Sequence, residues 1–203
     1  MSEARRLILA SGSRARKNML SAAGLGFDVV PADVAEDAIT SAMVSESDCV
    51  EAADIAGVLA AEKALSVARK HPNALVIGSD QVLAVGRRMF SKAADIAEAR
   101  ETLSALRGRA HELVSAVALG LGNDVVWQTV ESAQLTMRPF SDDFLDAYLG
   151  RYGDRILGSV GCYEIEGAGT QLFERIEGDH FTIMGMPLLP LLNELRKQGV
   201  VRT

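Results

Sequence analysis

The chain has 203 residues, of which 48% are hydrophobic, 24% charged and 5% aromatic. This composition excludes a disordered chain, and the length predicts a single domain spanning residues 1–203. A formal net charge of −6 and few aromatic residues argue against a nucleic-acid-binding protein, which needs a basic face or stacking side chains. No apolar run approaches the ~20 residues of a membrane helix, so we expect a cytoplasmic protein with no membrane partner.

The opening of the chain predicts a strand, a Ser/Gly turn, a helix and a second short strand. A continuous apolar run predicts the first strand, and Ser13 is a suitable N-cap for the helix. The polar stretch that follows, from Asp33 to Asp48, is expected to be irregular. The four predicted segments are Leu7–Ala10, Ser11–Ser13, 14–23 and Phe27–Val30.

The middle of the chain predicts a buried strand between two helices. Apolar residues from Ile55 onward follow the helical period, and Asp95 with Glu98 resembles a capping box. The expected elements are a helix to Ala68, a strand over Ala74–Ile77 that ends at Gly78–Gln81, extended structure over Val82–Val85, and a helix from Asp95 to Leu106.

The second half predicts a long hairpin followed by a helix, short strands and a last helix. The segments are Leu113–Leu119, a turn over Gly120–Asp124, Val125–Met137, a helix from Ser141, strands over Cys162–Ile165 and Leu172–Ile176, and a helix from Pro187. A parallel opening joined to an antiparallel hairpin predicts an α/β fold with a mixed sheet flanked by helices. We expect the ligand site in a cleft between the opening unit and the later strands.

The segment from Ser11 to Lys17 has the features of an anion-binding site. It combines the amides of a Ser/Gly turn, the start of a helix, and cations at Arg14, Arg16 and Lys17. Helix N-terminal amides attract anions, and arginine donates paired hydrogen bonds to phosphate oxygens. A solvated basic helix start explains the same residues equally well, and the segment matches neither a Walker A nor a Rossmann motif.

Asp80 follows the predicted strand, at the place where open α/β sheets bind their ligands. Its carboxylate suits Mg²⁺ shared with phosphates, or removal of a proton from water, but a turn-forming aspartate is an equal explanation. Glu36 and Glu166 are candidates to complete the site. A two-residue period puts Glu164 and Glu166 on one strand face, for which a solvated edge is the simpler explanation.

Two lysines are placed near these candidates. Lys63 lies beside the apolar stripe of its helix, and Lys92 follows Met89-Phe90-Ser91, close after the Asp80 strand. A lysine whose stem packs on apolar surface while its charge stays in water is the default explanation for both. The histidines and the two cysteines, Cys49 and Cys162, form no motif for metal binding or thiol catalysis.

Taken in order, these segments resemble the Maf family of nucleoside triphosphate pyrophosphatases. Each motif alone is weak, but the ordered set is specific and runs from Leu7 to Leu195. Arg14 stands where the family usually has proline, and Ser91 and Ala93 replace its glycine and proline around Lys92. The matching segments are Leu7–Ser13 with Arg16 and Lys17, Glu62–Ala64, Gly78–Asp80, Ser91–Ala93, Arg107–Glu112, Glu166–Gly167, Ile176–Asp179 and Gly185–Leu188.

The resemblance implies a two-lobed, ITPase-like α/β fold with a strongly bent mixed β-sheet, a central cleft and a homodimer. It also implies hydrolysis of a nucleoside triphosphate to monophosphate and diphosphate with a divalent cation such as Mg²⁺, Mn²⁺ or Co²⁺. Asp80 is then the catalytic carboxylate and, with Glu36, a metal ligand. The implied substrate-binding residues are Ser11, Ser13, Arg16, Lys17, Lys63, Lys92 and Glu166.

Two features resemble the family branch that acts on 7-methyl-GTP, namely Ser79-Asp80-Gln81 and Glu166-Gly167. A carboxylate at position 166 can accept hydrogen bonds from N1–H and the amino group of a guanine, which a uracil or thymine cannot offer in that form. The alternative hypothesis is a non-catalytic, nucleotide-binding regulator of septum formation in cell division. Retention of Asp80 together with Lys63 and Lys92 favours the enzyme.

Overall fold

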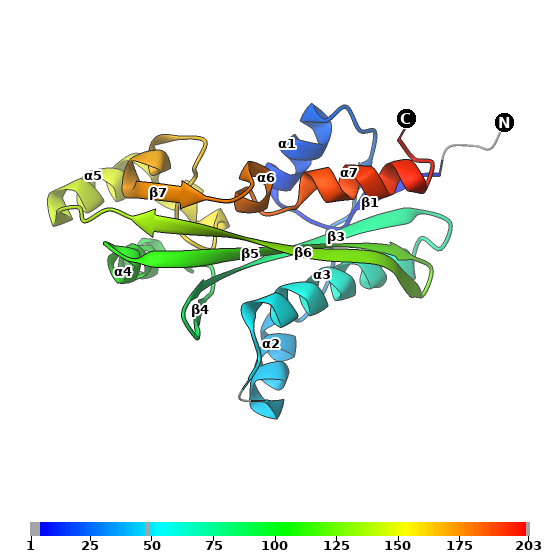
Figure 1. Ribbon diagram of the computed structural model, residues 1–203, viewed down its shortest axis with the longest axis horizontal. Helices are drawn as coiled ribbons and strands as arrows, with labels where there is room; N and C mark the ends of the chain where they lie inside the picture. The colour runs from blue at the N-terminus through cyan, green and yellow to red at the C-terminus, as the bar shows by residue number, and fades with distance from the viewer. Residues whose placement is uncertain (1–4, 48, 202–203) are drawn as a thin grey trace.

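The computed structural model describes residues 5–47 and 49–201. Within these residues seven strands form one mixed sheet in the order β2-β1-β3-β5-β6-β7, with β4 paired to β3 (Figure 1). β1 is parallel to β2 and to β3, and the other pairs are antiparallel. The strands are β1 (Leu7–Leu9), β2 (Asp28–Val29), β3 (Leu75–Val85), β4 (Arg88–Phe90), β5 (Ala110–Leu121), β6 (Asp124–Met137) and β7 (Phe173–Glu177). The predicted mixed sheet is confirmed.

Helices cover both faces of the sheet. α3 lies against one face, and α1, α6 and α7 lie on the opposite face (Figure 1). None of the helices in the described part of the chain is long and apolar enough to cross a membrane. The helices are α1 (Arg14–Ala22), α2 (Glu36–Glu46), α3 (Ala52–Ala68), α4 (Ile96–Leu106), α5 (Asp142–Tyr152), α6 (His180–Ile183) and α7 (Leu188–Lys197), with 3-10 turns η1 (Gly153–Gly158) and η2 (Ala168–Leu172).

The alternation of side chains along the central strands builds a separate core on each face. Val117 and Leu119 of β5 pack with α1 and α7, whereas Ala116 and Ala118 pack with α3. A further apolar cluster joins α4, α5 and η1 at one end of the sheet. Because β3 and β5 are buried on both faces, their sequences are nearly continuous apolar runs.

The sheet is a long twisted layer, and the strong bend that we expected is not present (Figure 1). The layer is dominated by the β5–β6 hairpin, whose strands pair from Ala110 to Leu121 along almost their whole length. Twist accumulates along such extended antiparallel pairing.

Three sequence-based predictions of local structure are wrong. β3 runs without a break through Gly78–Gln81, since these residues pair with β5. The stretch 33–48 contains helix α2, although Asp48 lies outside the described residues. Cys162–Ile165 is not a strand, because Cys162 has a left-handed backbone (φ 56°) that interrupts extended structure.

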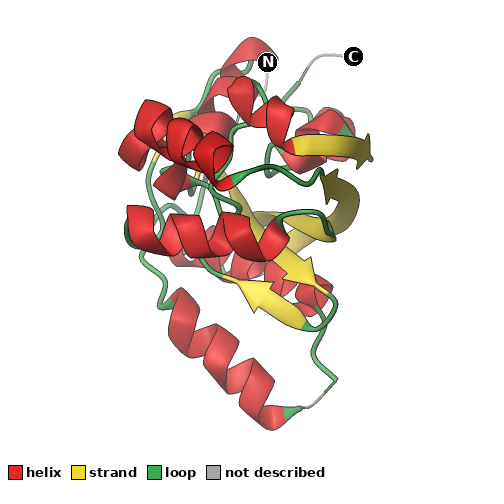
Figure 2. Ribbon diagram, turned by 90° about the vertical axis from the view of Figure 1, so that its left-hand side faces the viewer, coloured by secondary structure: helices red, strands yellow, loops and turns green. Residues whose placement is uncertain are grey.

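Helix α2 was not predicted because its sequence has no periodic stripe of apolar residues. α2, all of which lies within the described range, has no buried residue, so no apolar stripe marks it. It projects away from the sheet in both views (Figures 1 and 2). Its first residue, Glu36, nevertheless lies at the cavity described next.

Candidate active site

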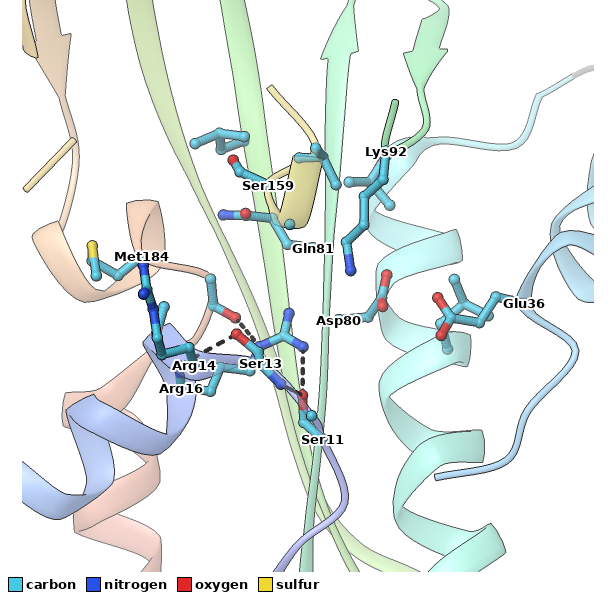
Figure 3. A pocket seen from close by; sticks show the side chains of 18 of the residues that line it. Ser11, Ser13, Arg14, Arg16, Glu36, Asp80, Gln81, Lys92, Ser159 and Met184 are labelled. Carbon is cyan, nitrogen blue, oxygen red and sulfur yellow. Dashed lines mark hydrogen bonds between the residues drawn. The ribbon is translucent and has the colours of Figure 1, made fainter. Parts of the chain in front are cut away.

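A cavity of about 1580 Å³ lies beside the middle of β3, between the start of α1 and helix α3, and extends to the segment 155–166. Its walls come from the start of α1, the start of α2, α3, the middle of β3, the loop after β4 and the segment 183–185. Figure 3 shows side chains from these distant parts of the chain pointing into one space. This is the location in which an α/β fold of this kind is expected to bind its ligand.

A buried lysine in this cavity is paired with two carboxylates. Lys63 Nζ lies 2.5 Å from Asp80 Oδ1 and 2.8 Å from Glu36 Oε1. The side chains of Lys63 and Asp80 are only 11% and 10% exposed, whereas that of Glu36 is 49% exposed. Removing a charge from water is costly unless it is paired, so this arrangement fixes the Asp80 carboxylate in one position.

Close packing of α3 on β3 explains how Lys63 reaches Asp80. A Cβ atom added to Gly78 would overlap the carbonyl oxygen of Ala60 and lie 2.5 Å from the amide nitrogen of Ala64. Glycine in the strand and alanines on the helix therefore let the two backbones approach closely. Lys63, beside this contact, is thereby held against the strand position of Asp80.

The N-terminus of α1 brings a cation and helix amides into the same cavity. Ser13 caps the helix by accepting a hydrogen bond from the Arg16 amide (3.4 Å). The buried Arg16 guanidinium donates from Nη1 to Ser11 Oγ (3.2 Å) and from Nε to the Gly185 carbonyl (2.9 Å). Burial lowers the pKa of Arg16, and the charges of Asp80 and Glu36 oppose that effect. An anion is the ligand that best compensates such a buried cation.

Two polar residues of β3, Ser79 and Gln81, anchor the part of the cavity wall around Gly185, and the sequence predicted no site role for either. Ser79 Oγ donates to the Gly185 carbonyl (3.0 Å), and Gln81 Nε2 donates to the Thr182 carbonyl (3.1 Å) and to Ser115 Oγ (3.0 Å). These bonds tie α6 and the segment after it to the sheet. The sequence signal was the polar Ser79–Gln81 run inside an otherwise apolar strand.

The other predicted site residues differ in where the structure places them. Ser11, Ser13 and Lys92 line the cavity, and Lys92 points its ammonium group toward Asp80 in Figure 3. Glu166 also lines the cavity, from an exposed turn before η2. The prediction that Glu164 and Glu166 share one strand face is wrong, because this segment is not a strand. Lys17 is exposed and is not among the described lining residues.

Three interactions at the cavity wall were not predicted. Glu164 forms ion pairs with Arg14 and Arg155. His111 Nε2 lies 2.8 Å from the hydroxyl oxygen of Tyr163, a lining residue. No sequence pattern marked them, because Arg14 lies 150 residues from Glu164 and His111 lies 52 residues from Tyr163.

The buried histidine and cysteine near this wall are not suited to proton transfer or nucleophilic attack near neutral pH. Burial lowers the pKa of His111 to about 4, so the ring is neutral there. Burial raises the pKa of the Cys162 thiol to about 11, which keeps it protonated. Both residues are therefore buried, uncharged side chains near the wall.

The carboxylates of the cavity fit a divalent cation that shares its coordination with a phosphate ligand. The carboxylates of Glu36 and Asp80 lie close together, since each contacts Lys63 Nζ. In the described ranges 5–47 and 49–201, no group of three or more His, Cys, Asp or Glu side chains is placed to hold a metal ion. Mg²⁺ is commonly bound by one or two carboxylates together with substrate phosphates, and two are available here.

The fold and this cavity define an α/β protein in which a buried arginine and a fixed carboxylate face one space. The sequence profile of the family described as "Maf-like protein" matches residues 6–198. The chain therefore belongs to the Maf family, as its motifs indicated.

Relatives of similar length carry two kinds of name. A "Nucleoside triphosphate pyrophosphatase" of Granulibacter bethesdensis is 50% identical over 192 residues, which cover 95% of this chain and 96% of that protein. A "7-methyl-GTP pyrophosphatase" of Rhizobium meliloti is 48% identical over 195 residues, covering 96% and 97% of the two chains. The same name is carried by a protein of Mesorhizobium japonicum, 48% identical over 196 residues that cover 97% and 98%.

Among solved structures, a dITP/XTP pyrophosphatase from Mycobacterium abscessus is similar with a TM-score of 0.37 and 17% identity. The match covers 72% of this chain and 93% of that one. A TM-score at this level is not evidence of a shared fold.

Proposed function

We propose that this protein hydrolyses a nucleoside triphosphate between its α- and β-phosphates, giving a nucleoside monophosphate and diphosphate, with 7-methyl-GTP as a preferred substrate. The observation that carries the proposal is the buried Lys63–Asp80 pair facing the start of α1 within one cavity. Membership of the Maf family and the names of the relatives at 48–50% identity support the same activity.

In this proposal Asp80 accepts the proton of a water molecule that attacks the α-phosphorus. The new bond joins the water oxygen to the α-phosphorus, and the bond from that phosphorus to the bridging oxygen breaks, so diphosphate leaves. Water attack on a phosphate needs charge neutralisation and in-line positioning as well as a base. Arg16, Lys63 and Lys92 supply the cations, and Ser11 and Ser13 add hydrogen-bonding groups at the start of α1.

Glu36 and Asp80 would hold the divalent cation together with the phosphate oxygens. When bound, such an ion neutralises phosphate charge during the displacement. Lys17 is left out of the proposed site because it does not line the described cavity. From the family resemblance we also propose a two-lobed homodimer in the cytoplasm, which sedimentation velocity of the purified protein tests for the oligomeric state.

The decisive experiment is a screen for diphosphate release from canonical and modified nucleoside triphosphates with Mg²⁺ or Mn²⁺. We expect release from at least one triphosphate, with monophosphate as the second product. A mock purification from cells that do not express the protein, prepared in parallel, controls for contaminating phosphatases. No release above that control from any substrate would reject the proposed activity.

For the base, we propose that Glu166 accepts hydrogen bonds from the N1–H and amino groups of 7-methylguanine. Glu166→Gln replaces one acceptor oxygen by a donor, so kcat/KM for 7-methyl-GTP should fall about tenfold or more relative to UTP. Glu174→Gln, on exposed β7, is the matched control. An unchanged substrate profile in Glu166→Gln would show that this carboxylate does not read the base.

A further inference from the structure

One carboxylate at the cavity holds two arginines from different parts of the chain. Glu164 Oε1 lies 2.8 Å from Arg14 Nη2, and Glu164 Oε2 lies 2.5 Å from Arg155 Nη2. Arg14 begins α1, Arg155 belongs to η1, and Glu164 lies in the segment that leads to Glu166. All three side chains line the cavity, so the ion pairs connect its two sides.

The exposure of these groups makes the arginines available to a ligand. The side chains of Arg14 and Arg155 are 65% and 55% exposed, whereas that of Glu164 is 24% exposed. Exposed ion pairs contribute little free energy, so a stronger anion can replace the carboxylate. The set carries two positive charges and one negative charge, and it stays cationic while Glu164 is bound.

The position of Arg14 relates this pair to the proposed phosphate site. Arg14 follows the N-cap Ser13 and precedes the buried Arg16, and Figure 3 shows all three around the start of α1. A phosphate group bound at that helix start would lie next to the first residue of the helix, which is Arg14. Guanidinium groups bind phosphate oxygens through paired hydrogen bonds, as they bind a carboxylate.

We propose that Glu164 stands in for a ligand anion: Arg14 and Arg155 form an accessory phosphate-binding pair, and a phosphate of the substrate's polyphosphate chain replaces Glu164 on it. This inference rests on the proposed function for the identity of the substrate. It adds Arg14 and Arg155 to the charged groups around Asp80 as residues that contact the substrate's phosphates. It also makes Glu164 a competitor for the substrate.

A purely structural role for the three residues predicts a different result. If the ion pairs only brace the two sides of the cavity, removing either partner loosens the same contact, and both changes weaken binding. If Glu164 competes with phosphate, removing its charge strengthens binding, whereas removing Arg14 weakens it. Opposite signs therefore separate the two explanations.

The test measures binding of inorganic tripolyphosphate, which lacks a base and a ribose, by isothermal titration calorimetry. We expect Glu164→Gln to lower the Kd, and Arg14→Ala and Arg155→Ala to raise it, each about three- to tenfold. The controls are Arg175→Ala and Glu177→Gln, which break an exposed ion pair outside the described cavity lining and should leave the Kd within about twofold.

Each alternative result overturns the inference. A higher Kd in Glu164→Gln would identify a structural brace, and an unchanged Kd in all three variants would show that phosphate does not reach this pair. Because the probe is not a nucleotide and no turnover is measured, these results are independent of the proposed activity. Diphosphate release with unchanged Kd values would reject this inference alone, and opposite shifts without turnover would reject only the activity.

Discussion

At the scale of single residues, Asp80 differs from the other acidic side chains of the cavity because its position is fixed. Glu36 and Glu166 are more exposed, whereas Asp80 is buried on a central strand and held by Lys63 at 2.5 Å. A general base must keep its carboxylate directed at the attacking water, and this contact supplies that orientation. The proposed chemistry therefore depends on Asp80 more than on its acidic neighbours.

We predict that Asp80→Asn lowers kcat for diphosphate release roughly 10²- to 10⁴-fold, because the amide cannot accept the proton. Lys63 keeps Glu36 as a partner, so the fold should be retained. Kinetics and urea unfolding of the same preparation measure both properties. Asp142→Asn removes an exposed carboxylate paired with Arg107 and should retain wild-type rates. Near-normal turnover in Asp80→Asn would place the base elsewhere.

His111 gives a prediction for stability rather than for activity. Its Nδ1 atom has no hydrogen-bond partner among the described residues, and burial lowers the pKa from 6.5 to about 4. Below pH 6.5 the unfolded chain binds a proton here that the folded protein does not bind until near pH 4. The free energy of unfolding should thus fall by about 2–3 kcal/mol between pH 7.5 and 4.5 from this group.

Urea unfolding at the two pH values checks this, with His111→Gln as the variant that lacks the titrating ring. The decrease in unfolding free energy on acidification should be about 2–3 kcal/mol smaller in His111→Gln than in the wild type. His180→Gln, at an exposed histidine, is the control and should follow the wild type. Equal pH dependence of His111→Gln and wild type would mean that His111 contributes nothing to acid sensitivity.

At the scale of helices and strands, the sequence predicted those elements whose pattern of buried residues is visible among neighbouring positions. The β5–β6 hairpin and α7 were predicted because alternation or helical spacing of buried residues is visible in the chain itself. α2 has no buried residue, and β3 carries Ser79 and Asp80 inside a strand, so both contradict the simple pattern. The buried polar side chains of β3 have hydrogen-bond partners that are distant in sequence. Ser79, for example, donates to the Ala116 carbonyl.

The same reasoning applies to the candidate site. The sequence marked Asp80, Lys63 and Glu36 one at a time, with an equally simple alternative explanation for Asp80 and a simpler one for Lys63 and Glu36. Their grouping depends on α3 packing against β3, which no short motif shows. The ion pair of Arg14 with Glu164 joins residues 150 positions apart and has no local signal. Only the family resemblance gathered several of the site residues in advance.

The contact between α3 and β3 leads to a prediction for Gly78→Ala. The added methyl group meets the backbone of α3 at Ala60 and Ala64, so the helix must move, at a cost of about 1–3 kcal/mol in unfolding free energy. Moving α3 displaces Lys63 from Asp80, so kcat/KM should fall as well. Thermal unfolding and steady-state kinetics measure the two effects.

Gly150→Ala is the matched control for this substitution. Gly150 lies in the exposed part of α5, and an added Cβ there has no heavy atom of the described residues within 4 Å. Alanine is the better helix former, so this variant should gain about 0.5–1 kcal/mol without a change in kinetics. A fully stable and active Gly78→Ala would show that α3 can shift without consequence for the site.

At the scale of the whole molecule, a net charge of −6 opposes the binding of a triphosphate, which is itself highly negative. The structure resolves this by concentrating cations where they are needed. Arg14, Arg16, Lys63, Lys92 and Arg155 all line the same cavity. Buried Arg16 and Lys63 are little affected by salt, whereas the exposed cations are screened by it.

Substitutions at two lysines can distinguish the effect of charge in the cavity from the effect of the protein's net charge. Both lysines are exposed, but Lys92 lines the cavity and Lys17 does not. Lys92→Gln and Lys17→Gln change the net charge by the same amount. If local charge governs binding, Lys92→Gln raises KM about two- to fivefold and flattens its increase with NaCl, while Lys17→Gln keeps the wild-type KM and salt dependence. Steady-state kinetics from 50 to 500 mM salt, roughly a threefold change in Debye length, measure both effects. Equal effects of the two substitutions would instead mean that substrate binding responds to the average charge of the protein.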